Sequence, residues 1–269
     1  MNITRQVQLH QLEMLKCLAS IFDAEGITYF AIGGTALGAV RHEGFIPWDD
    51  DIDLAMPRDD YERFLKLQDR LPVNLIIQNF RTQNEYPLYF SKVRDIHTRY
   101  VEKRLGKYDI AHGVFIDIFP WDAVGDATAM RRIVKRNEHR FKRSIVPSNK
   151  GIPAKIKAYF YRALYGFKSP ATLFERLDES CRCCNGQETG RIGNLCYDDI
   201  IATGDLLPLE RWKFEDTMIW LPGKVRKYLS DKYGDYMRIP DEKDRITHNP
   251  IEVAIPADTP SNAHLRRQA

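Results

Sequence analysis

The chain has 269 residues, of which 43% are hydrophobic and 29% are charged. This balance is typical of a globular protein and excludes a disordered, collagen-like or coiled-coil chain. The longest stretch without a charged residue, 26–40, has 15 residues, fewer than the roughly 20 that a membrane-spanning helix needs. The N-terminus lacks an apolar signal-peptide core, and the five cysteines do not follow a secreted disulfide pattern. We therefore expect a cytoplasmic protein.

The net charge of +3 conceals a strongly basic segment. Residues 131–168 contain twelve Lys or Arg and a single acid, Glu138, a local charge of +11 that leaves −8 for the rest of the chain. Such a block is either the solvated face of a helix or a surface for an anionic partner. The sequence leaves both interpretations open.

The first 124 residues combine helical and strand patterns. Apolar residues at helical spacing predict an amphipathic helix over 4–23, which Gly26 ends. β-branched and aromatic residues predict a buried strand over 27–32, and a short helix is expected over 36–41. The elements expected next are a strand near 51–56, a helix over 57–71, and strands over 73–78, 88–94 and 114–119.

The second half is expected to be mainly helical, with helices over 127–144, 153–167, 170–184 and 222–233. Mixed patterns followed by helices predict an α/β (α+β) protein. We divide it into a catalytic core at 1–124, a mainly helical region at 125–255 and a flexible tail at 256–269. The helical region would complete the site and carry the basic segment.

Four aspartates lie within the five residues 49–53. On a strand side chains alternate, so Asp51 and Asp53 share one face while Ile52 and Leu54 share the other. Close carboxylates repel one another and need a compensating charge. Their hard oxygen atoms suit Mg²⁺ or Mn²⁺, so this segment is a candidate metal site.

A third carboxylate and a glycine turn extend the pattern. Asp117 stands alone in an apolar strand, where an unpaired carboxylate is costly, so it is another candidate ligand. Gly33 and Gly34, followed by Thr35, come directly after a predicted strand and would let backbone N–H groups approach a phosphate closely. The alternative is that 49–53 is an exposed acidic turn and that Asp117 accepts backbone hydrogen bonds.

Together these motifs resemble the DNA polymerase β-type nucleotidyltransferase fold. In that fold two carboxylates hold the metal ions that bridge the nucleotide phosphates, and a third lies beside the attacking hydroxyl. Residues 33–53, which read GGTALGAVRHEGFIPWDDDID, also look like the signature of the LicD family, whose relatives include fukutin and fukutin-related protein. Further stretches similar to the family occur at 90–95, 113–120, 213–215, 228–237 and 245–248.

The resemblance implies a mixed sheet with an appended helical region and a metal-dependent phosphotransferase. Bacterial members typically transfer phosphocholine from CDP-choline to cell-surface glycans, and animal relatives transfer ribitol phosphate from CDP-ribitol. We therefore expect a CDP-alcohol donor, with CDP-choline favoured, and release of CMP. The acceptor would be a glycan or lipid-linked saccharide, such as a lipopolysaccharide or teichoic acid precursor. The family's metal site matches Asp51, Asp53 and Asp117, with Asp117 also acting as the base.

Several basic residues are candidates for contacting the donor. Arg41 and His42 follow the glycine turn, where they either bind phosphate or form ion pairs with the acidic cluster. Lys92 and Arg94 lie two residues apart on a predicted strand and share a face, which suits a diphosphate. His248 is more often a satisfied core or surface histidine than a site residue.

Aromatic residues and cysteines have ordinary explanations. Trp48 and Trp121 could surround a quaternary ammonium group through cation–π contacts, but aromatic residues at such spacing mostly form core. Four cysteines within 181–196 lack the paired knuckle of a structural zinc site, so zinc is not expected.

The basic segment also contains an apolar stripe, formed by Ile156, Tyr159, Phe160, Ala163, Leu164 and Phe167. Lys155, Lys157, Arg162 and Lys168 flank this stripe. It either packs on the domain or lies on an anionic membrane, where each basic residue adds about 1 kcal/mol. A lipid-linked acceptor favours the second interpretation and would place the protein at the inner face of the cell membrane.

Two other functions remain open. A nucleotidyltransferase would attach NMP to a small molecule or protein and release pyrophosphate instead of CMP. A non-catalytic nucleic-acid-binding protein would use the basic segment. An acidic cluster repels phosphate backbones when no metal is bound, so we do not expect a nucleic-acid partner.

Overall fold

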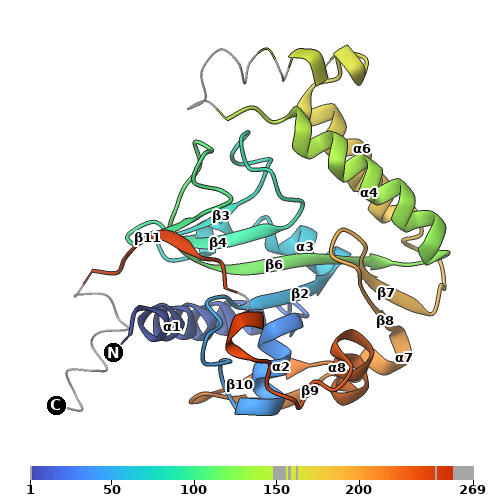
Figure 1. The fold of residues 1–269 in the computed structure, drawn as a ribbon. Helices are drawn as coiled ribbons and strands as arrows, with labels where there is room; N and C mark the ends of the chain where they lie inside the picture. Colours follow the sequence, from blue (N-terminus) through green and yellow to red (C-terminus); the bar gives the residue numbers. More distant parts are fainter. Residues whose placement is uncertain (1, 148–155, 157–158, 162, 246, 257–269) are drawn as a thin grey trace.

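The computed structural model describes residues 2–147, 156, 159–161, 163–245 and 247–256, with a mixed sheet at its centre (Figure 1). The strand order is β1–β2–β6–β4–β3, and β7 and β8 continue from the end of β6. Its strands are β1 (Phe30–Ala31), β2 (Asp53–Pro57), β3 (Leu75–Gln78), β4 (Ser91–Asp95), β6 (Val114–Ala123), β7 (Arg191–Asn194) and β8 (Asp199–Ala202). The predicted α/β class is confirmed.

Strands β2 and β6 are parallel, and their register positions the acidic residues. Asp53 on β2 lies opposite Asp117 on β6, and Lys92 on β4 lies opposite Asp117 on the other side. Residues opposite each other on neighbouring strands point to the same face. Three strands therefore bring two carboxylates and one ammonium group side by side.

Helix α1 (Ile3–Ala24) confirms the predicted amphipathic helix and packs beside β6. Gln11 projects from its buried face, where its Nε2 donates to the backbone oxygens of Asp50 (2.9 Å) and Phe115 (3.1 Å). The helix therefore holds the acidic segment against the sheet. The apolar part of the same face includes Val7, Leu15, Leu18 and Phe22.

Helix α2 (Gly33–His42) packs against α8 (Val225–Tyr233) and β9 (Glu210–Phe214) at the lower end of Figure 1. Because α2 begins directly at Gly33, the strand predicted over 27–32 shrinks to the two residues of β1. The helix predicted over 57–71 is divided into α3 (Arg58–Phe64) and a 3₁₀ turn (Gln68–Arg70).

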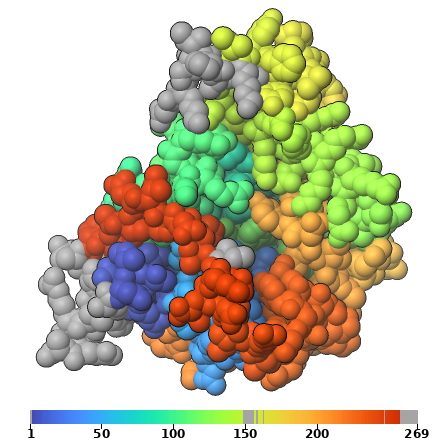
Figure 2. All heavy atoms as spheres, in the orientation of Figure 1, coloured from blue at the N-terminus to red at the C-terminus, as the bar shows by residue number. Residues whose placement is uncertain are grey.

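Helices α4 (Ala127–Ser144) and α6 (Pro170–Arg182) confirm two predicted helices and pack against each other at the upper end of the molecule (Figures 1 and 2). Each begins at a side-chain cap, Asp126 for α4 and Ser169 for α6. The pair has its own small core, which includes Phe80, Phe141, Phe174 and Leu177.

The sequence analysis missed the strands that lie within 191–221 and at 250–254, among the helices of the second half. These ranges contain β7 and β8 of the main sheet, β9 paired with β10 (Thr217–Leu221), and β11 (Pro250–Ala254), which pairs with β5 (Arg99–Glu102). All of them are four or five residues long and several are largely exposed, so their alternation is too short to recognise from sequence. The remaining short elements are α7 (Thr203–Leu206) and a 3₁₀ turn at Glu242–Asp244.

Two predictions fall partly outside the described residues. Within the helix predicted over 153–167, residues 156, 159–161 and 163–164 are helical. Of the tail at 256–269, the structure describes residue 256 alone. No helix in the described part of the chain is both long and apolar enough to cross a membrane.

Candidate active site

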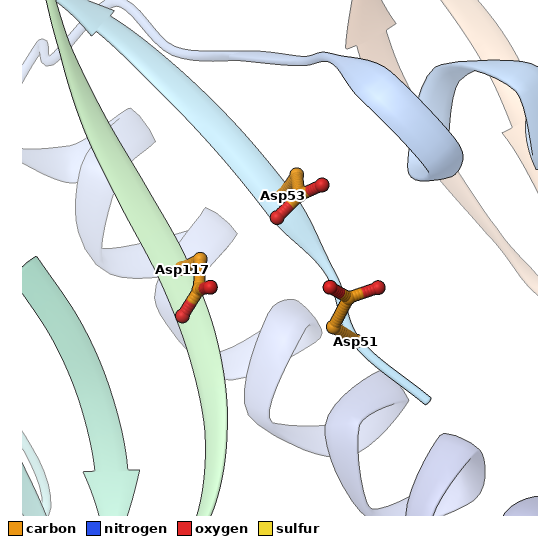
Figure 3. Close-up of side chains that lie close together, drawn as sticks. All are labelled: Asp51, Asp53 and Asp117. Carbon is orange, nitrogen blue, oxygen red and sulfur yellow. The ribbon is translucent and has the colours of Figure 1, made fainter. Parts of the chain in front are cut away.

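Three carboxylates converge at the centre of the sheet. Asp51 lies just before β2, Asp53 is the first residue of β2, and Asp117 is on β6 (Figure 3). One oxygen of each lies within 4.8 Å of the others. Ile52 and Leu54 are fully buried on the opposite side. The structure therefore brings together the three carboxylates that the sequence selected.

This arrangement concentrates negative charge in a buried position. Burial, and then the charges of Asp51 and Asp117, raise the pKa of Asp53 well above its usual range. Burial and the neighbouring Asp51 do the same to the pKa of Asp49. Burial raises the pKa of Asp117 to about 6, although Lys92 opposes the shift. Close, repelling oxygen donors of this kind fit a divalent cation such as Mg²⁺ or Mn²⁺.

The carboxylates line a cavity of about 490 Å³. Gly34, Asp49, Lys92 and Glu102 line the same cavity. The apolar and aromatic residues of the lining are Leu88, Phe90, Leu105, Phe119 and Tyr197. Three exposed or half-exposed cations also line the cavity, namely Lys103, Arg104 and Lys142. A short segment near the C-terminus completes the lining with Thr247, His248 and Asn249.

The glycine turn packs directly on the acidic cluster. A Cβ at Gly34 would lie 2.6 Å from Oδ2 of Asp49, so a larger residue would displace that carboxylate. Gly33 adopts a left-handed conformation (φ 55°), and its N–H donates to the Tyr228 hydroxyl at 3.0 Å. The Thr35 hydroxyl accepts the backbone N–H of Asp53 at 2.8 Å. Of the predicted phosphate turn, Gly34 therefore lines the cavity, while Gly33 and Thr35 support it.

Lys92 reaches the cavity, but its ammonium group is already paired. Its Nζ lies 2.7 and 3.0 Å from the two oxygens of Asp117 and 3.3 Å from Glu102, and the residue is 1% exposed. Lys92 therefore compensates charge inside the cluster. Burial alone would raise the pKa of Glu102, but the charges of Lys92 and Arg94 lower it to about 2.

Arg94 does not line the cavity, contrary to the predicted phosphate contact. Its guanidinium group is completely buried and donates to Gln78, to the backbone oxygen of Gly113 (2.8 Å) and to Glu102 (2.6 Å). Lys92 and Arg94 do lie two residues apart on one strand. The buried acid Glu102 binds both of them, so neither is free for a diphosphate.

Arg41 and His42 form no ion pair with the acidic cluster within the described chain. Arg41 donates to the backbone oxygens of Tyr236 (2.8 Å) and Arg238 (3.3 Å), so it holds the chain that follows α8. His42 accepts from the Arg41 Nε and meets the ring of Trp48 edge-on. Both lie outside the cavity lining.

The tryptophans considered for an ammonium box also lie elsewhere. Trp121 is fully buried against Phe30, and Trp48 packs against the guanidinium group of Arg245. The aromatic residues that do line the cavity are Phe90, Phe119 and Tyr197. Sequence spacing could not have singled them out, because they come from three segments that are far apart in the chain.

His248 lines the cavity, although the sequence analysis favoured an ordinary core or surface histidine at this position. Its Nδ1 lies 2.9 Å from Oδ1 of Asp50, which also accepts the His248 backbone N–H at 3.1 Å. Its Nε2 lies 3.6 Å from Oδ2 of Asp51. Burial alone would lower the pKa of His248, but the hydrogen bond to Asp50 and the charge of Asp51 raise it to about 9. Its position 198 residues after Asp50 gives no local sequence signal.

The cysteines form no recognisable metal site. Among the described residues, Asp51, Asp53 and Asp117 are the one group of His, Cys, Asp or Glu with the geometry of a metal site. Cys181 and Cys196 are buried and Cys183 is exposed, all as free thiols.

The chain is similar in sequence to known proteins. Residues 26–155 match the model of the LicD/FKTN/FKRP nucleotidyltransferase domain. The chain is 26% identical to the lipopolysaccharide cholinephosphotransferase LicD of Haemophilus influenzae, over 93% of this chain and 97% of that protein. A segment of 48 residues is 40% identical to the human and mouse ribitol 5-phosphate transferase FKRP, covering 18% of this chain and 10% of theirs. Residues 26–155 of the chain therefore belong to the LicD family of nucleotidyltransferase domains.

Proposed function

We propose that the protein transfers a substituted phosphate from a CDP-alcohol, with CDP-choline favoured, to a sugar hydroxyl of a cell-surface glycan or its lipid-linked precursor. The observation that carries this proposal is the convergence of Asp51, Asp53 and Asp117 beside Gly34 in one cavity. The similar proteins named above are themselves a cholinephosphotransferase and ribitol 5-phosphate transferases. The same motifs favour a polymerase β-type fold.

Within this proposal, Asp51 and Asp53 would hold Mg²⁺ or Mn²⁺. When bound, the ion would supply positive charge to the donor diphosphate. Asp117 accepts the proton of the acceptor hydroxyl as its oxygen forms a bond to phosphorus and the bond from phosphorus to CMP breaks. Its raised pKa of about 6 suits a base that must be ionised at neutral pH and still accept a proton.

The aromatic wall supports choline as the transferred alcohol. Phe90 and Phe119 stack with ring centroids 4.3 Å apart, and Tyr197 meets them edge-on at 5.2 and 5.1 Å. Aromatic faces attract quaternary ammonium groups through cation–π contacts. These three aromatic residues line the same cavity as the carboxylates. One donor molecule could therefore contact the carboxylates through its diphosphate and the aromatic rings through its choline group.

The proposal is tested by incubating the protein with CDP-choline, CDP-ethanolamine, CDP-glycerol or CDP-ribitol, a glycan acceptor and Mg²⁺, and measuring CMP. We expect EDTA to abolish CMP release and added Mg²⁺ to restore it. Asp51→Asn should lower turnover at least about 100-fold, whereas Asp59→Asn, an exposed acid outside this cavity, should not. Full activity in EDTA would refute the metal site. Pyrophosphate release with the nucleotide left on the acceptor would favour the NMP transferase.

We also propose that the upper end of the molecule contacts an anionic membrane. Near α4 and its arginines, five apolar side chains are 60–66% exposed: Ile156, Tyr159, Phe160, Leu164 and Phe167. Exposed aromatic and aliphatic groups beside cations suit a lipid interface. Lys155, Lys157 and Arg162, expected to flank them, lie outside the described residues.

Liposome flotation tests this surface. Binding should require anionic lipid, weaken at high salt because screening shortens the reach of the charges, and fall in a Phe160→Ser, Leu164→Ser variant. Equal binding to neutral and anionic vesicles would contradict the proposal. Salt-dependent binding of RNA or DNA, with no binding to anionic vesicles, would favour nucleic acid as the partner.

A further inference from the structure

The residues expected to bind the donor diphosphate are not available for it. Lys92 is paired with Asp117 and Glu102, and Arg94 is buried among Gln78, Gly113 and Glu102. Moving Lys92 would take the ammonium group away from Asp117, and moving Arg94 would remove one of the two cations that pair with the buried Glu102. Either change is costly in a buried position. A side chain that contacts the phosphates beside the metal ion would therefore have to be a residue other than Lys92 and Arg94.

His248 has the required position and orientation. Its Nδ1 and its backbone N–H are both held by Asp50, which is itself fixed by the Tyr100 hydroxyl at 2.5 Å. The ring packs edge-on against Phe115 at 5.6 Å. These contacts fix one side of the imidazole and leave Nε2 on the cavity side, near Asp51.

Nε2 is free for a ligand in a way that the Lys92 and Arg94 donors are not. Within the described chain its nearest acidic atom is Oδ2 of Asp51 at 3.6 Å, which is longer than a hydrogen bond. Asp51 is also a proposed metal ligand. An anion bound beside that metal would therefore lie close to Nε2.

We propose that His248 is a substrate-binding residue whose Nε2–H donates to a phosphate oxygen of the cytidine diphosphate donor. This inference rests on the proposed function and adds a contact to it. The pairing of β11 with β5 brings His248, just before β11, close to Tyr100 and the acidic cluster.

The experiment measures the dissociation constants of CDP and cytidine by calorimetry, in Mg²⁺, for the wild type and for His248→Ala. A charge-assisted hydrogen bond to phosphate predicts CDP binding roughly 10- to 100-fold weaker in the variant. Cytidine, which lacks the phosphates, should bind with unchanged affinity. His248→Gln keeps a neutral N–H donor and should give an intermediate CDP affinity.

Two matched variants separate a positioned contact from general electrostatics and from folding. Lys107→Met removes an exposed cation close in the chain to the cavity wall but outside its lining, and it should change CDP affinity by less than about 3-fold, as expected of a screened charge. Arg94→Met should lower the melting temperature while leaving the ratio of CDP to cytidine affinity unchanged.

The outcomes are distinguishable. If the wild type does not bind CDP, the proposed donor class fails. If it binds CDP and His248→Ala binds CDP equally well, the role assigned to His248 is wrong. Equal weakening of CDP and cytidine, accompanied by a lower melting temperature, would show that His248 acts through folding alone and would also overturn the inference.

Discussion

Asp53→Asn should stabilise the protein when no metal is present, although it should impair catalysis. Oxygens of Asp51, Asp53 and Asp117 lie within 4.8 Å of one another. At an effective dielectric constant of about 20, two unit charges at that distance repel by about 3.5 kcal/mol. Asp53 escapes part of this repulsion by taking up a proton, which is why its pKa is raised. We therefore expect a net gain of about 1–3 kcal/mol from the substitution.

The sign of the pH dependence follows from the direction of that pKa shift. A carboxyl group whose pKa is higher in the folded state stabilises the fold at low pH, below its unfolded pKa of about 4. That contribution is lost as the pH rises through the folded value. In EDTA, the amount by which Asp53→Asn is more stable than the wild type should therefore increase from pH 5 to pH 8.

Urea denaturation with EDTA or with saturating Mg²⁺ measures both effects. Mg²⁺ at about 100 times its dissociation constant should stabilise the wild type by about 2.7 kcal/mol and should stabilise Asp53→Asn much less. Asp50→Asn is the matched control, because Asp50 accepts hydrogen bonds from Tyr100 and His248. The free energy of unfolding of Asp50→Asn should be about 1–3 kcal/mol lower than that of the wild type, both in EDTA and in Mg²⁺. An Asp53→Asn protein that is less stable than the wild type in EDTA at pH 8 would refute the reasoning.

Three further predictions concern single residues of the same region. Asp117→Asn should lower turnover, measured by CMP release, by about 10²- to 10⁴-fold. The affinity for CDP, measured by calorimetry, should change little. Loss of CDP binding would mean that Asp117 mainly holds the metal. Arg94→Met should cost about 3–5 kcal/mol in urea denaturation because it removes one of the two cations that pair with the buried Glu102 and the donor to Gln78 and Gly113. An unchanged stability would contradict that pairing. The pKa of His248 is raised to about 9, so the charged imidazole stabilises the fold fully below about pH 6.5, and this stabilisation is lost as the pH rises through about 9. Because the side chain is about one-third exposed, we expect the stabilisation to be about 1–2 kcal/mol. Urea denaturation of His248→Ala at several pH values should lack this pH dependence.

The sequence by itself determined the features that depend on local periodicity. Alternation along a strand was enough to place Asp51 and Asp53 on one face, away from Ile52, and the structure agrees. Helical spacing predicted α1, α4, α6 and α8 because each has a long apolar stripe. The short strands after residue 190 have no comparable repeat and were missed.

Only the tertiary structure decided which charged groups pair. Lys92 and Arg94 have the spacing of a phosphate-binding pair, but Glu102, on the neighbouring β5, binds both because buried charges need partners. His248 and Asp50 are 198 residues apart and meet because β11 pairs with β5. Ion pairing depends on distances between strands, and those are set by the packing of the whole chain. A one-dimensional pattern identifies candidate ligands, but the fold determines which of them remain free to bind.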